Sequence, residues 1–267
     1  MDIHPRAMVD PQAILGDGCV VGPDAIIGAG VVLGPGCSIG PRAFLTGKTV
    51  LGSRVKVGVG ALIGGDPQDL AYRGAASATE IGDDTVIREY VTVHRGTQEG
   101  TRTWIGRNCY LMAGSHVAHN CRLEDHVILV NNVLLAGYVE VGARAFVGGA
   151  AVVHQFTRIG AYAMIRGLTR LGRDVPPYCM ATHTNTLSGL NKVGLRRNGF
   201  DDARRRRILR AVELLCHSPL NRTQALEAIR VDADLQHADI DLLVQFAETT
   251  KRGLCGWRDT TAGAEDE

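Results

Sequence analysis

Aliphatic side chains recur at every sixth position from Ile3 to Leu171, with two interruptions. On this period, 26 positions are Ile, Leu or Val, and the period breaks after Ile63 and after Val93. The residue four positions after nearly every one of these anchors is small or β-branched, and the residue one position after it is often glycine. Such hexads are typical of a β-helix, in which three hexads close one triangular coil.

The hexads therefore predict an all-β domain over residues 1–180, a parallel β-helix of nine or ten coils. Coils spaced by roughly 4.8 Å, as paired strands are, make this domain about 45 Å long. We expect the anchors to stack on their equivalents in the next coil. We expect the glycine to relieve the corner, where a positive φ is costly for other residues. The cysteines that fall in the small inward slot, and are expected to be buried and unreactive, are Cys19, Cys37, Cys109 and Cys121.

Two insertions interrupt the hexads, at about 65–79 and 95–104. Loops inserted into a solenoid usually lie on one face and carry function. After Val175 the period of six ends, and from about Asp201 the apolar residues recur with helical spacing. We therefore expect a linker over 181–200, a small α-helical domain over 201–258 and a flexible acidic tail over 259–267.

Composition narrows the class of protein. The chain has 267 residues, of which 33 are glycine, and 45% are hydrophobic although only 5% are aromatic. Glycine without a G-X-Y period excludes collagen, and the apolar content argues against disorder. A formal charge of +1 gives no whole-chain attraction to nucleic acid. We expect no membrane span and no secretory signal, and seven cysteines without a C-x-x-C pair fit a cytoplasmic protein.

Polar side chains that break the hexads gather near one edge of the predicted prism. His119, Tyr138 and His154 follow anchors that lie three hexads apart, one coil each, and His116 precedes the same corner. His94 and His154 take the slot that glycine usually fills. Imidazole suits a general base near neutral pH, whereas clustered histidines also suit a metal ion. The spacing differs from the three-histidine zinc pattern of hexapeptide carbonic anhydrases, so we favour the base and expect no metal.

Several motifs resemble those of the UDP-N-acetylglucosamine O-acyltransferase family, in order over nearly the whole chain. They are GGDPQDLAYRG (64–74), IREYVTVHRGT (87–97), AGSHVAHNC (113–121), LLAGYVEVG (134–142), VVHQFTRIGAYAM (152–164), DVPPY (174–178) and GLRRNGF (194–200). The resemblance implies a left-handed β-helix and a homotrimer with active sites between subunits. It also implies transfer of a 3-hydroxyacyl group from the phosphopantetheine of acyl carrier protein to the 3-position of UDP-N-acetylglucosamine, the first step of lipid A biosynthesis, without a further cofactor.

The resemblance assigns roles to individual residues. His119 matches the general base that deprotonates the sugar hydroxyl, and the Gly137 N–H matches the donor to the tetrahedral oxyanion. Gly167 matches a position that limits acyl chain length. The residues that match substrate-contacting positions are Gln68, Asp69, His94, His116, Tyr138, His154, Gln155, Asn191 and Arg197. The residues that match the docking site for acyl carrier protein, although a basic helical face can also be merely solvated, are Arg204, Arg205, Arg206 and Arg207.

Four positions depart from the pattern of the family. Asn120 follows the expected base where some members have Asp, and Tyr138 stands where His is common. Ala71 replaces a frequent Lys, and Val193 replaces an expected acidic residue. Asn120 can fix the imidazole tautomer without raising its basicity. These departures leave open a 3-amino sugar nucleotide as acceptor, with an amide as product. A different hexapeptide enzyme or a non-catalytic β-helix scaffold would also explain the hexads, but the insertions and the stacked histidines disfavour both.

Overall fold

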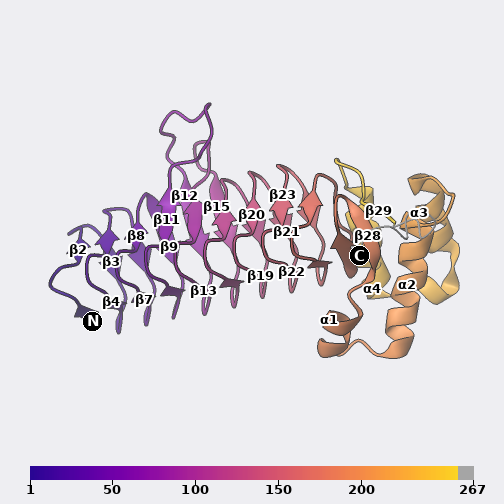
Figure 1. Ribbon diagram of the computed structural model, residues 1–267, viewed down its shortest axis with the longest axis horizontal. Helices are drawn as coiled ribbons and strands as arrows, with labels where there is room; N and C mark the ends of the chain where they lie inside the picture. Colours follow the sequence, from indigo (N-terminus) through magenta and orange to yellow (C-terminus); the bar gives the residue numbers. More distant parts are fainter. Residues whose placement is uncertain (258–267) are drawn as a thin grey trace.

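Each hexad folds as a short strand and a corner, and three hexads complete one turn of a triangular prism (Figure 1). The computed structural model describes residues 1–257. The fold is the predicted left-handed parallel β-helix with a small helical part at its C-terminal end. Equivalent strands of successive coils pair in parallel, most of them three hexads apart, as Val117 and Leu135 do.

Three sheets form the faces of the prism, and we name them sheets A, B and C. Sheet A contains β1 (Asp2–Ile3), β4 (Val20–Val21), β7 (Ser38–Ile39), β10 (Lys56–Val57), β13 (Val86–Ile87), β16 (Tyr110–Leu111), β19 (Ile128–Leu129), β22 (Phe146–Val147), β25 (Met164–Ile165), β27 (Cys179–Thr182), β28 (Thr186–Leu190) and β29 (Gly256–Trp257). Sheet B contains β2 (Met8–Val9), β5 (Ile26–Ile27), β8 (Phe44–Leu45), β11 (Leu62–Gly65), β14 (Thr92–His94), β17 (His116–Val117), β20 (Leu134–Leu135), β23 (Val152–Val153) and β26 (Arg170–Leu171). Sheet C contains β3 (Ile14–Leu15), β6 (Val32–Leu33), β9 (Lys48–Leu51), β12 (Ala78–Ile81), β15 (Arg102–Ile105), β18 (Arg122–Leu123), β21 (Glu140–Val141) and β24 (Arg158–Ile159).

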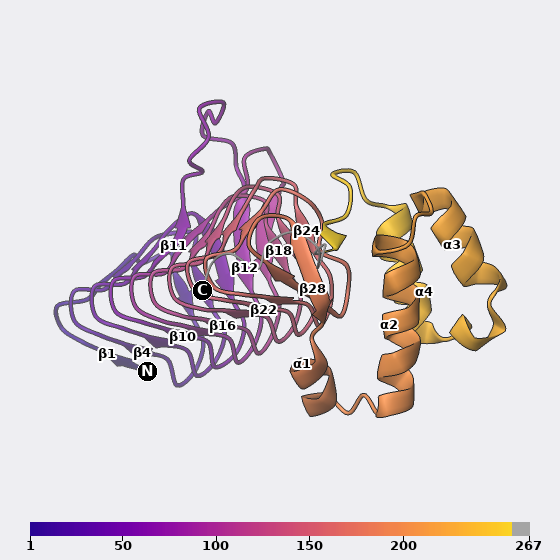
Figure 2. The same ribbon diagram turned by 45° about the vertical axis from the view of Figure 1, so that its right-hand side comes forward.

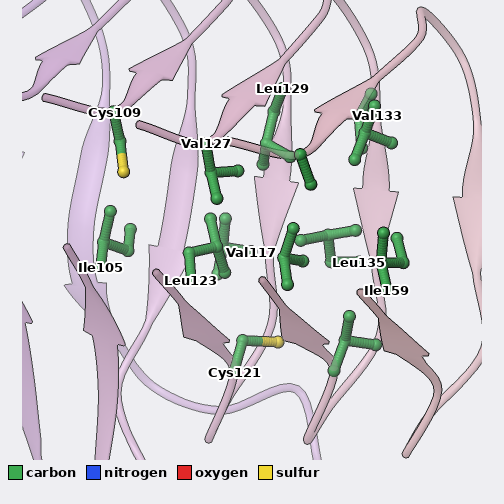
Figure 3. Close-up of a cluster of buried hydrophobic side chains, with 14 of the residues drawn as sticks. Ile105, Cys109, Val117, Cys121, Leu123, Val127, Leu129, Val133, Leu135 and Ile159 are labelled. Atoms are coloured by element: carbon green, nitrogen blue, oxygen red, sulfur yellow. The ribbon is translucent and has the colours of Figure 1, made fainter. Parts of the chain in front are cut away.

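Two side chains of each hexad point into the prism, the aliphatic anchor and the small residue four positions later (Figure 3). Val117 and Cys121 form one such pair, 0% and 1% exposed. Equivalent residues of successive coils stack along the prism axis, and each buried anchor contributes roughly 1.5–3 kcal/mol. The four cysteines assigned to the small slot are buried, as predicted: Cys19, Cys37, Cys109 and Cys121.

The glycines that follow the anchors have a different cause from the one expected. Positive φ falls at the third residue after the anchor, which is usually not glycine, as at Asp24 and Asn108. Gly58, one residue after its anchor, has no positive φ. A Cβ on Gly58 would instead lie 2.6 Å from the backbone carbonyl carbon of Arg88 in the next coil. The expectation that glycine relieves a positive-φ corner is therefore wrong, and glycine here permits close approach between the backbones of two coils.

Both insertions leave the prism at the edge between sheets B and C. The first insertion, 66–77, joins β11 to β12, and the second insertion, 95–101, joins β14 to β15. The strands that follow keep their register, as in the pairing of Ile81 with Ile105, so the loops do not shift the phase of the hexads. The first insertion projects well beyond the prism in two views (Figures 1 and 2), and Leu70 on it is 98% exposed.

Where a linker is expected over 181–200, the chain forms regular structure. Strands β27 and β28 make an antiparallel hairpin that extends sheet A, and α1 (Lys192–Arg197) follows. The remaining helices are α2 (Asp202–Cys216), α3 (Arg222–Val231), the 3₁₀ helix η1 (Ala233–Leu235) and α4 (Ala238–Glu248). Asp201 caps α2 by accepting a hydrogen bond from the Arg204 N–H, at the predicted helix start. The tail expected over 259–267 lies outside the described residues. Within residues 1–257, no helix has the length and apolar character needed to cross a membrane.

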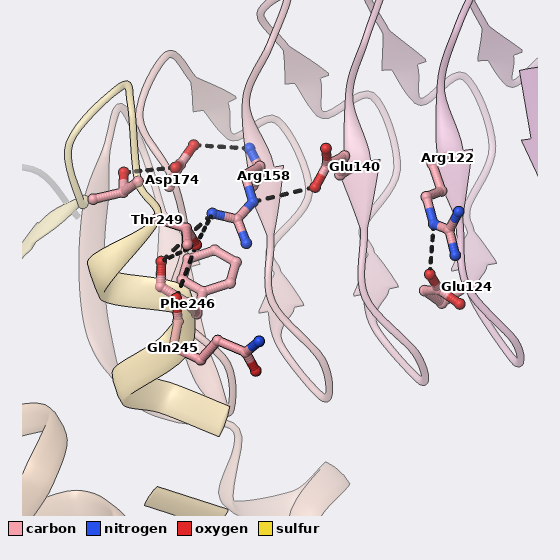
Figure 4. Close-up of polar contacts among 9 residues, drawn as sticks. Arg122, Glu124, Glu140, Arg158, Asp174, Gln245, Phe246 and Thr249 are labelled. Atoms are coloured by element: carbon pink, nitrogen blue, oxygen red, sulfur yellow. Dashed lines mark hydrogen bonds and ion pairs between the residues drawn. The ribbon is translucent and has the colours of Figure 1, made fainter. Parts of the chain in front are cut away.

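The helical part is fastened to the last coils through Arg158 and Asp174 (Figure 4). The Arg158 guanidinium donates to Thr249 Oγ1 at 3.0 Å and lies 4.2 Å from the centre of the Phe246 ring. The buried Asp174 carboxylate accepts hydrogen bonds from the Thr250 hydroxyl at 2.6 Å and from the Arg158 backbone N–H at 2.8 Å. These contacts hold the end of α4 against sheet C.

Candidate active site

The edge between sheets B and C collects the histidines that the sequence predicts to lie together. His119 lies in the corner after β17, Gly137 in the corner after β20, and His154 in the corner after β23. Because these three strands pair in register, their corners stack one coil above another. The ring of His94, at the end of β14, meets the ring of His116 edge to face at 4.9 Å. The period of the sequence therefore places these residues correctly.

His119 lies at the centre of this cluster and is only 7% exposed. Its Nδ1 lies 3.1 Å from Oδ1 of Asn120. The ring of Tyr138 packs edge to face against the imidazole, with 5.3 Å between ring centres. On the side of the next coil, Cε1 and Nε2 of the imidazole face Gly137. Three neighbours thus hold the ring in one orientation.

The imidazole of His119 fills the space that a side chain at position 137 would occupy. A Cβ on Gly137 would lie 2.3 Å from Cε1 of His119. Among the described residues, the Gly137 N–H donates to no other group. The backbone N–H of the residue two positions after an anchor rarely takes part in the hydrogen bonds between coils. Proline lacks this N–H and is therefore tolerated at the same position, as at Pro23 and Pro35. The Gly137 N–H is thus a spare donor beside His119.

Two equivalents of this N–H bind a carboxylate oxygen of the next coil. The Ser53 N–H donates to Asp83 Oδ1 at 2.7 Å, and the Arg107 N–H donates to Asp125 Oδ1 at 2.8 Å. The slot therefore suits an oxygen that carries negative charge. At Gly137, where no carboxylate of residues 1–257 takes this place, a developing oxyanion can do so.

The second insertion contacts the residue next to His119. Thr97 donates its backbone N–H and its hydroxyl to Asn120 Oδ1, at 3.1 and 2.9 Å, and the Tyr138 hydroxyl lies 3.0 Å from Thr97 Oγ1. The ring of Tyr138 in turn stacks on that of Phe156 at 4.9 Å. Thr97 and Phe156 are absent from the residues predicted to form the site. Only the position of Thr97 in an insertion pointed to it.

Two neighbours of His119 are held in the neutral form at pH 7. Burial, with smaller effects of His116 and His119, lowers the pKa of His94 to about 4. Burial also lowers the pKa of His116, with a smaller effect of His119. The His116 ring is oriented by Thr92, whose Oγ1 lies 2.7 Å from Nδ1. These two neutral neighbours therefore add no positive charge beside His119.

Gln68 and Asp69 lie apart from this edge, on the projecting first insertion. Gln68 is exposed, and Asp69 Oδ1 accepts the Ala71 N–H at 2.8 Å. Arg95 ties the base of this loop to the second insertion, since it donates to the Gly64 carbonyl at 2.9 Å and to the Tyr72 hydroxyl at 3.1 Å. Within one chain, the base of the first insertion is therefore held in place, but the loop does not cover His119.

Other predicted residues lie on different parts of the chain. Gly167 lies in a corner between sheets A and B, on the far side of sheet B from His119. Asn191 caps α1: its Oδ1 accepts from the Gly194 N–H and its Nδ2 donates to the Tyr162 carbonyl at 2.9 Å. Both polar atoms of Asn191 are thus used within the chain. Arg197, on α1, is exposed.

The four arginines of α2 differ in their contacts. Arg204 forms a double hydrogen bond with the buried Asp239 at 2.5 and 2.7 Å, and this ion pair joins α2 to α4. Arg205 is also held within the chain, by an acidic neighbour and a backbone carbonyl. Arg206 and Arg207 line a shallow surface groove and pair with no carboxylate among residues 1–257. The predicted docking patch thus divides into two structural and two available arginines.

Grooves border the B–C edge on both of its sides. The groove on sheet B, of about 520 Å³, is lined by His154, Gln155 and Arg170 among others. The groove on sheet C, of about 990 Å³, begins at Asn120 and Tyr138. Within the described part of the chain, no cluster of His, Cys, Asp and Glu has an arrangement that could hold a metal ion.

Both the sequence and the fold are similar to those of known acyltransferases. Residues 174–255 match the family described as UDP N-acetylglucosamine O-acyltransferase, domain 2, and residues 2–35 and 102–137 match the bacterial transferase hexapeptide family. An acyl-[acyl-carrier-protein]–UDP-N-acetylglucosamine O-acyltransferase of Alkalilimnicola ehrlichii is 52% identical over 254 residues, 94% of this chain and 98% of the relative. The solved structure of LpxA from Acinetobacter baumannii matches with a TM-score of 0.91 at 34% identity, over 94% of this chain and 98% of that one. The UDP-N-acetylglucosamine acyltransferase from Campylobacter jejuni matches with a TM-score of 0.90 at 33% identity, over 96% and 100%.

Proposed function

This chain belongs to the family of acyl-[acyl-carrier-protein]–UDP-N-acetylglucosamine O-acyltransferases, and on this premise we propose that His119 is the general base of its reaction. The enzyme transfers an acyl group from acyl carrier protein to UDP-N-acetylglucosamine in lipid A biosynthesis. The observation that carries the role of His119 is its contact with Gly137, which sets a proton acceptor beside a spare backbone donor.

The proposed step needs a base and an oxyanion donor, and no covalent enzyme intermediate. Nε2 of His119 removes the proton of the sugar 3-hydroxyl as the oxygen attacks the carbonyl carbon of the 3-hydroxyacyl thioester. Negative charge then gathers on the former carbonyl oxygen, which accepts a hydrogen bond from the Gly137 N–H. When the tetrahedral intermediate collapses, the C–S bond breaks, and the proton on His119 passes to the departing phosphopantetheine thiolate. The products are the sugar ester and the carrier thiol.

Three features support a homotrimer with active sites between subunits. Several outward side chains of sheet B are apolar and exposed, among them Met8, Phe44, Leu134 and Val152, between 40% and 60% exposed. The first insertion projects away from its own prism, as loops that reach a neighbour do. Arg197 lies on α1, at the end of sheet A rather than at the B–C edge. In a trimer, a neighbouring subunit can place its first insertion and its Arg197 near the His119 of this chain.

The carrier protein and the compartment complete the proposal. Arg206 and Arg207 offer unpaired charge to the acidic acyl carrier protein. The seven free cysteines suit a reducing compartment, which fits a cytoplasmic enzyme.

The role of His119 is tested by H119A, with H126A as the matched control. His126 follows His119 by one hexad and lies in the corner between sheets C and A, at a different edge of the prism. We expect H119A to lose roughly 10²- to 10⁴-fold in kcat at unchanged circular dichroism, and H126A to stay at the wild-type rate. Wild-type activity in folded H119A would remove His119 as the base. Supplying a 3-amino sugar nucleotide in parallel, with mass spectrometry of products, checks ester against amide formation.

The position of the site is tested by mixing inactive variants. H119A and a Q68A/D69A double variant each lose one half of the proposed site. If the halves come from different subunits, unfolding and refolding the two together restores part of the activity, because some mixed trimers contain an intact site. If the mixtures stay inactive, His119, Gln68 and Asp69 of each active site come from the same chain.

A further inference from the structure

We propose that Thr97 of the second insertion, steadied by Tyr138, fixes the ring tautomer of His119 through the carboxamide of Asn120. This makes Thr97, and Tyr138 through its hydroxyl, positioning residues for the base. The proposal rests on the proposed role of His119 as base. It assigns a task to the second insertion and to Tyr138, a residue at which this chain departs from the pattern of its family.

The backbone N–H of Thr97 identifies which way the amide of Asn120 faces, and it shares with the Thr97 hydroxyl the task of holding the amide there. A backbone N–H can only donate, and it lies 3.1 Å from the Asn120 atom that faces it. That atom must therefore be Oδ1. A rotated amide would set its NH₂ group against the N–H of Thr97, donor against donor, and leave both groups unsatisfied.

The hydroxyl of Thr97 supports the same orientation. It donates to Asn120 Oδ1 at 2.9 Å. Since its one hydrogen is used in this way, its contact with Tyr138 at 3.0 Å is a hydrogen bond donated by the Tyr138 hydroxyl. The ring of Tyr138 is fixed in turn by stacking on Phe156. The order of donation therefore runs from Tyr138 to Thr97 to Asn120.

The orientation of the amide then decides the tautomer of the imidazole. An amide oxygen can only accept, and Oδ1 of Asn120 lies 3.1 Å from Nδ1 of His119. Nδ1 must therefore carry the hydrogen, which leaves Nε2 unprotonated on the side of Gly137. This is the tautomer that a base acting at Nε2 requires. Asn120 itself is neutral, so the network contributes orientation and no charge.

The second insertion is anchored well enough for this task. Arg95, two residues before Thr97, donates to the Gly64 carbonyl and to the Tyr72 hydroxyl on the first insertion. From the other side, the Thr101 hydroxyl closes the loop by donating to the Gln98 carbonyl at 2.8 Å. Thr97 thus sits between two fixed points, and its side chain is half-buried.

The test compares T97V, which keeps the shape and the backbone N–H of Thr97 but lacks the hydroxyl, with T97S, which restores the hydroxyl. Q98A is the matched control in the same loop, because the Gln98 side chain makes no hydrogen bond within residues 1–257. We expect T97V to lower kcat roughly tenfold with KM for UDP-N-acetylglucosamine unchanged, and T97S and Q98A to stay within about twofold of wild type. Y138F is expected to lower kcat less than T97V does, because the lost hydroxyl bonds to Thr97 and not to Asn120 itself.

Two further readouts separate positioning from a general loss of structure. With ¹⁵N-histidine labelling, and the His119 signals assigned by their absence in H119A, wild-type protein should show a protonated Nδ1, and T97V a mixture of tautomers. N120D, which keeps the acceptor and adds charge, should move the acidic limb of the kcat profile to higher pH, whereas T97V should lower the plateau without moving the limb.

The outcomes distinguish this inference from the proposed function. If H119A is inactive while T97V keeps wild-type kcat and tautomer, the inference is overturned and His119 stands as the base. If folded H119A is fully active, the proposed function fails, and the ¹⁵N tautomer of T97V still decides whether Thr97 controls the ring. A T97S variant as slow as T97V would also overturn the inference, since it restores the hydroxyl.

Discussion

The imidazole of His119 lies directly against Gly137 of the next coil, where a methyl group would come within 2.3 Å of ring carbon Cε1 and 2.6 Å of Nε2. The spacing between coils thus brings the proposed base and the spare backbone donor together. No loop is needed to bring them together.

This contact predicts that G137A is strongly impaired although it keeps the backbone N–H. Gly137 has no positive φ, so alanine fits the backbone, but its methyl group must displace the ring of His119. We expect kcat to fall roughly 10²-fold with little change in the melting temperature. G149A is the control, because a Cβ there meets its nearest neighbour at an ordinary 3.4 Å. A G137A enzyme with wild-type kcat would show that the ring has room to move.

Buried neutral histidines predict a loss of stability in acid. The pKa of His94 is about 4 in the folded protein, against an ordinary value of 6.5. The unfolded chain therefore binds more protons between these values, so the stability is fully present above about pH 6.5 and falls as pH approaches 4. At about 1.36 kcal/mol per pH unit, His94 contributes at most about 3 kcal/mol. Urea unfolding of H94Q should depend less on pH than that of wild type between pH 7 and 4.5, and an equal dependence would contradict this account.

The unpaired arginines of α2 predict a selective effect on the carrier protein. We expect R206E/R207E to raise KM for the acylated carrier roughly tenfold, most at low ionic strength, and to leave KM for the sugar nucleotide unchanged. K48E/K56E makes the same change of net charge on early coils and should change neither KM. Equal effects of the two double variants would show that the carrier protein responds to the net charge of the enzyme and not to Arg206 and Arg207 in particular.

The buried cysteines predict a protein that resists thiol reagents. Burial raises the pKa of Cys37 and Cys109 to about 11, and of Cys121, Cys216 and Cys255 to about 12. Thiolate, the reactive form, is therefore scarce at pH 8. Fewer than about one thiol per chain should react with an aromatic disulfide reagent within minutes, against all seven in denaturant. Rapid labelling of Cys19, Cys37, Cys109 or Cys121 in the native protein would show that the prism opens.

The prism and the stacking of its corners could be predicted because both follow from a local period. An anchor at every sixth residue fixes which side chains point inward, and three hexads to a coil set His119, Tyr138 and His154 on one edge. The cause of the glycines could not be predicted in the same way. The close approach between Gly58 and Arg88 joins two coils across an insertion, and sequence spacing alone does not show how near two backbones come.

Contacts between distant segments account for the other differences. The hairpin of β27 and β28 follows no hexad, so 181–200 is expected as a linker although it completes sheet A. Nothing in the run of arginines in α2 indicates that Arg204 pairs with Asp239, which lies 35 residues farther along the chain. Thr97 likewise gains its partner Asn120 only because the insertion folds back onto the next coil.

The N–H that the ladder between coils leaves unused has a consequence for how such a scaffold acquires chemistry. Every corner of the solenoid at which this slot is not proline presents a backbone amide of fixed direction, and these amides form columns along the edges of the prism. Some are already occupied by Asp83 or Asp125 and serve stability. A histidine on the coil before an unoccupied amide places a base beside a backbone donor without any new backbone, and elongation of the solenoid multiplies the positions where such a pair can form.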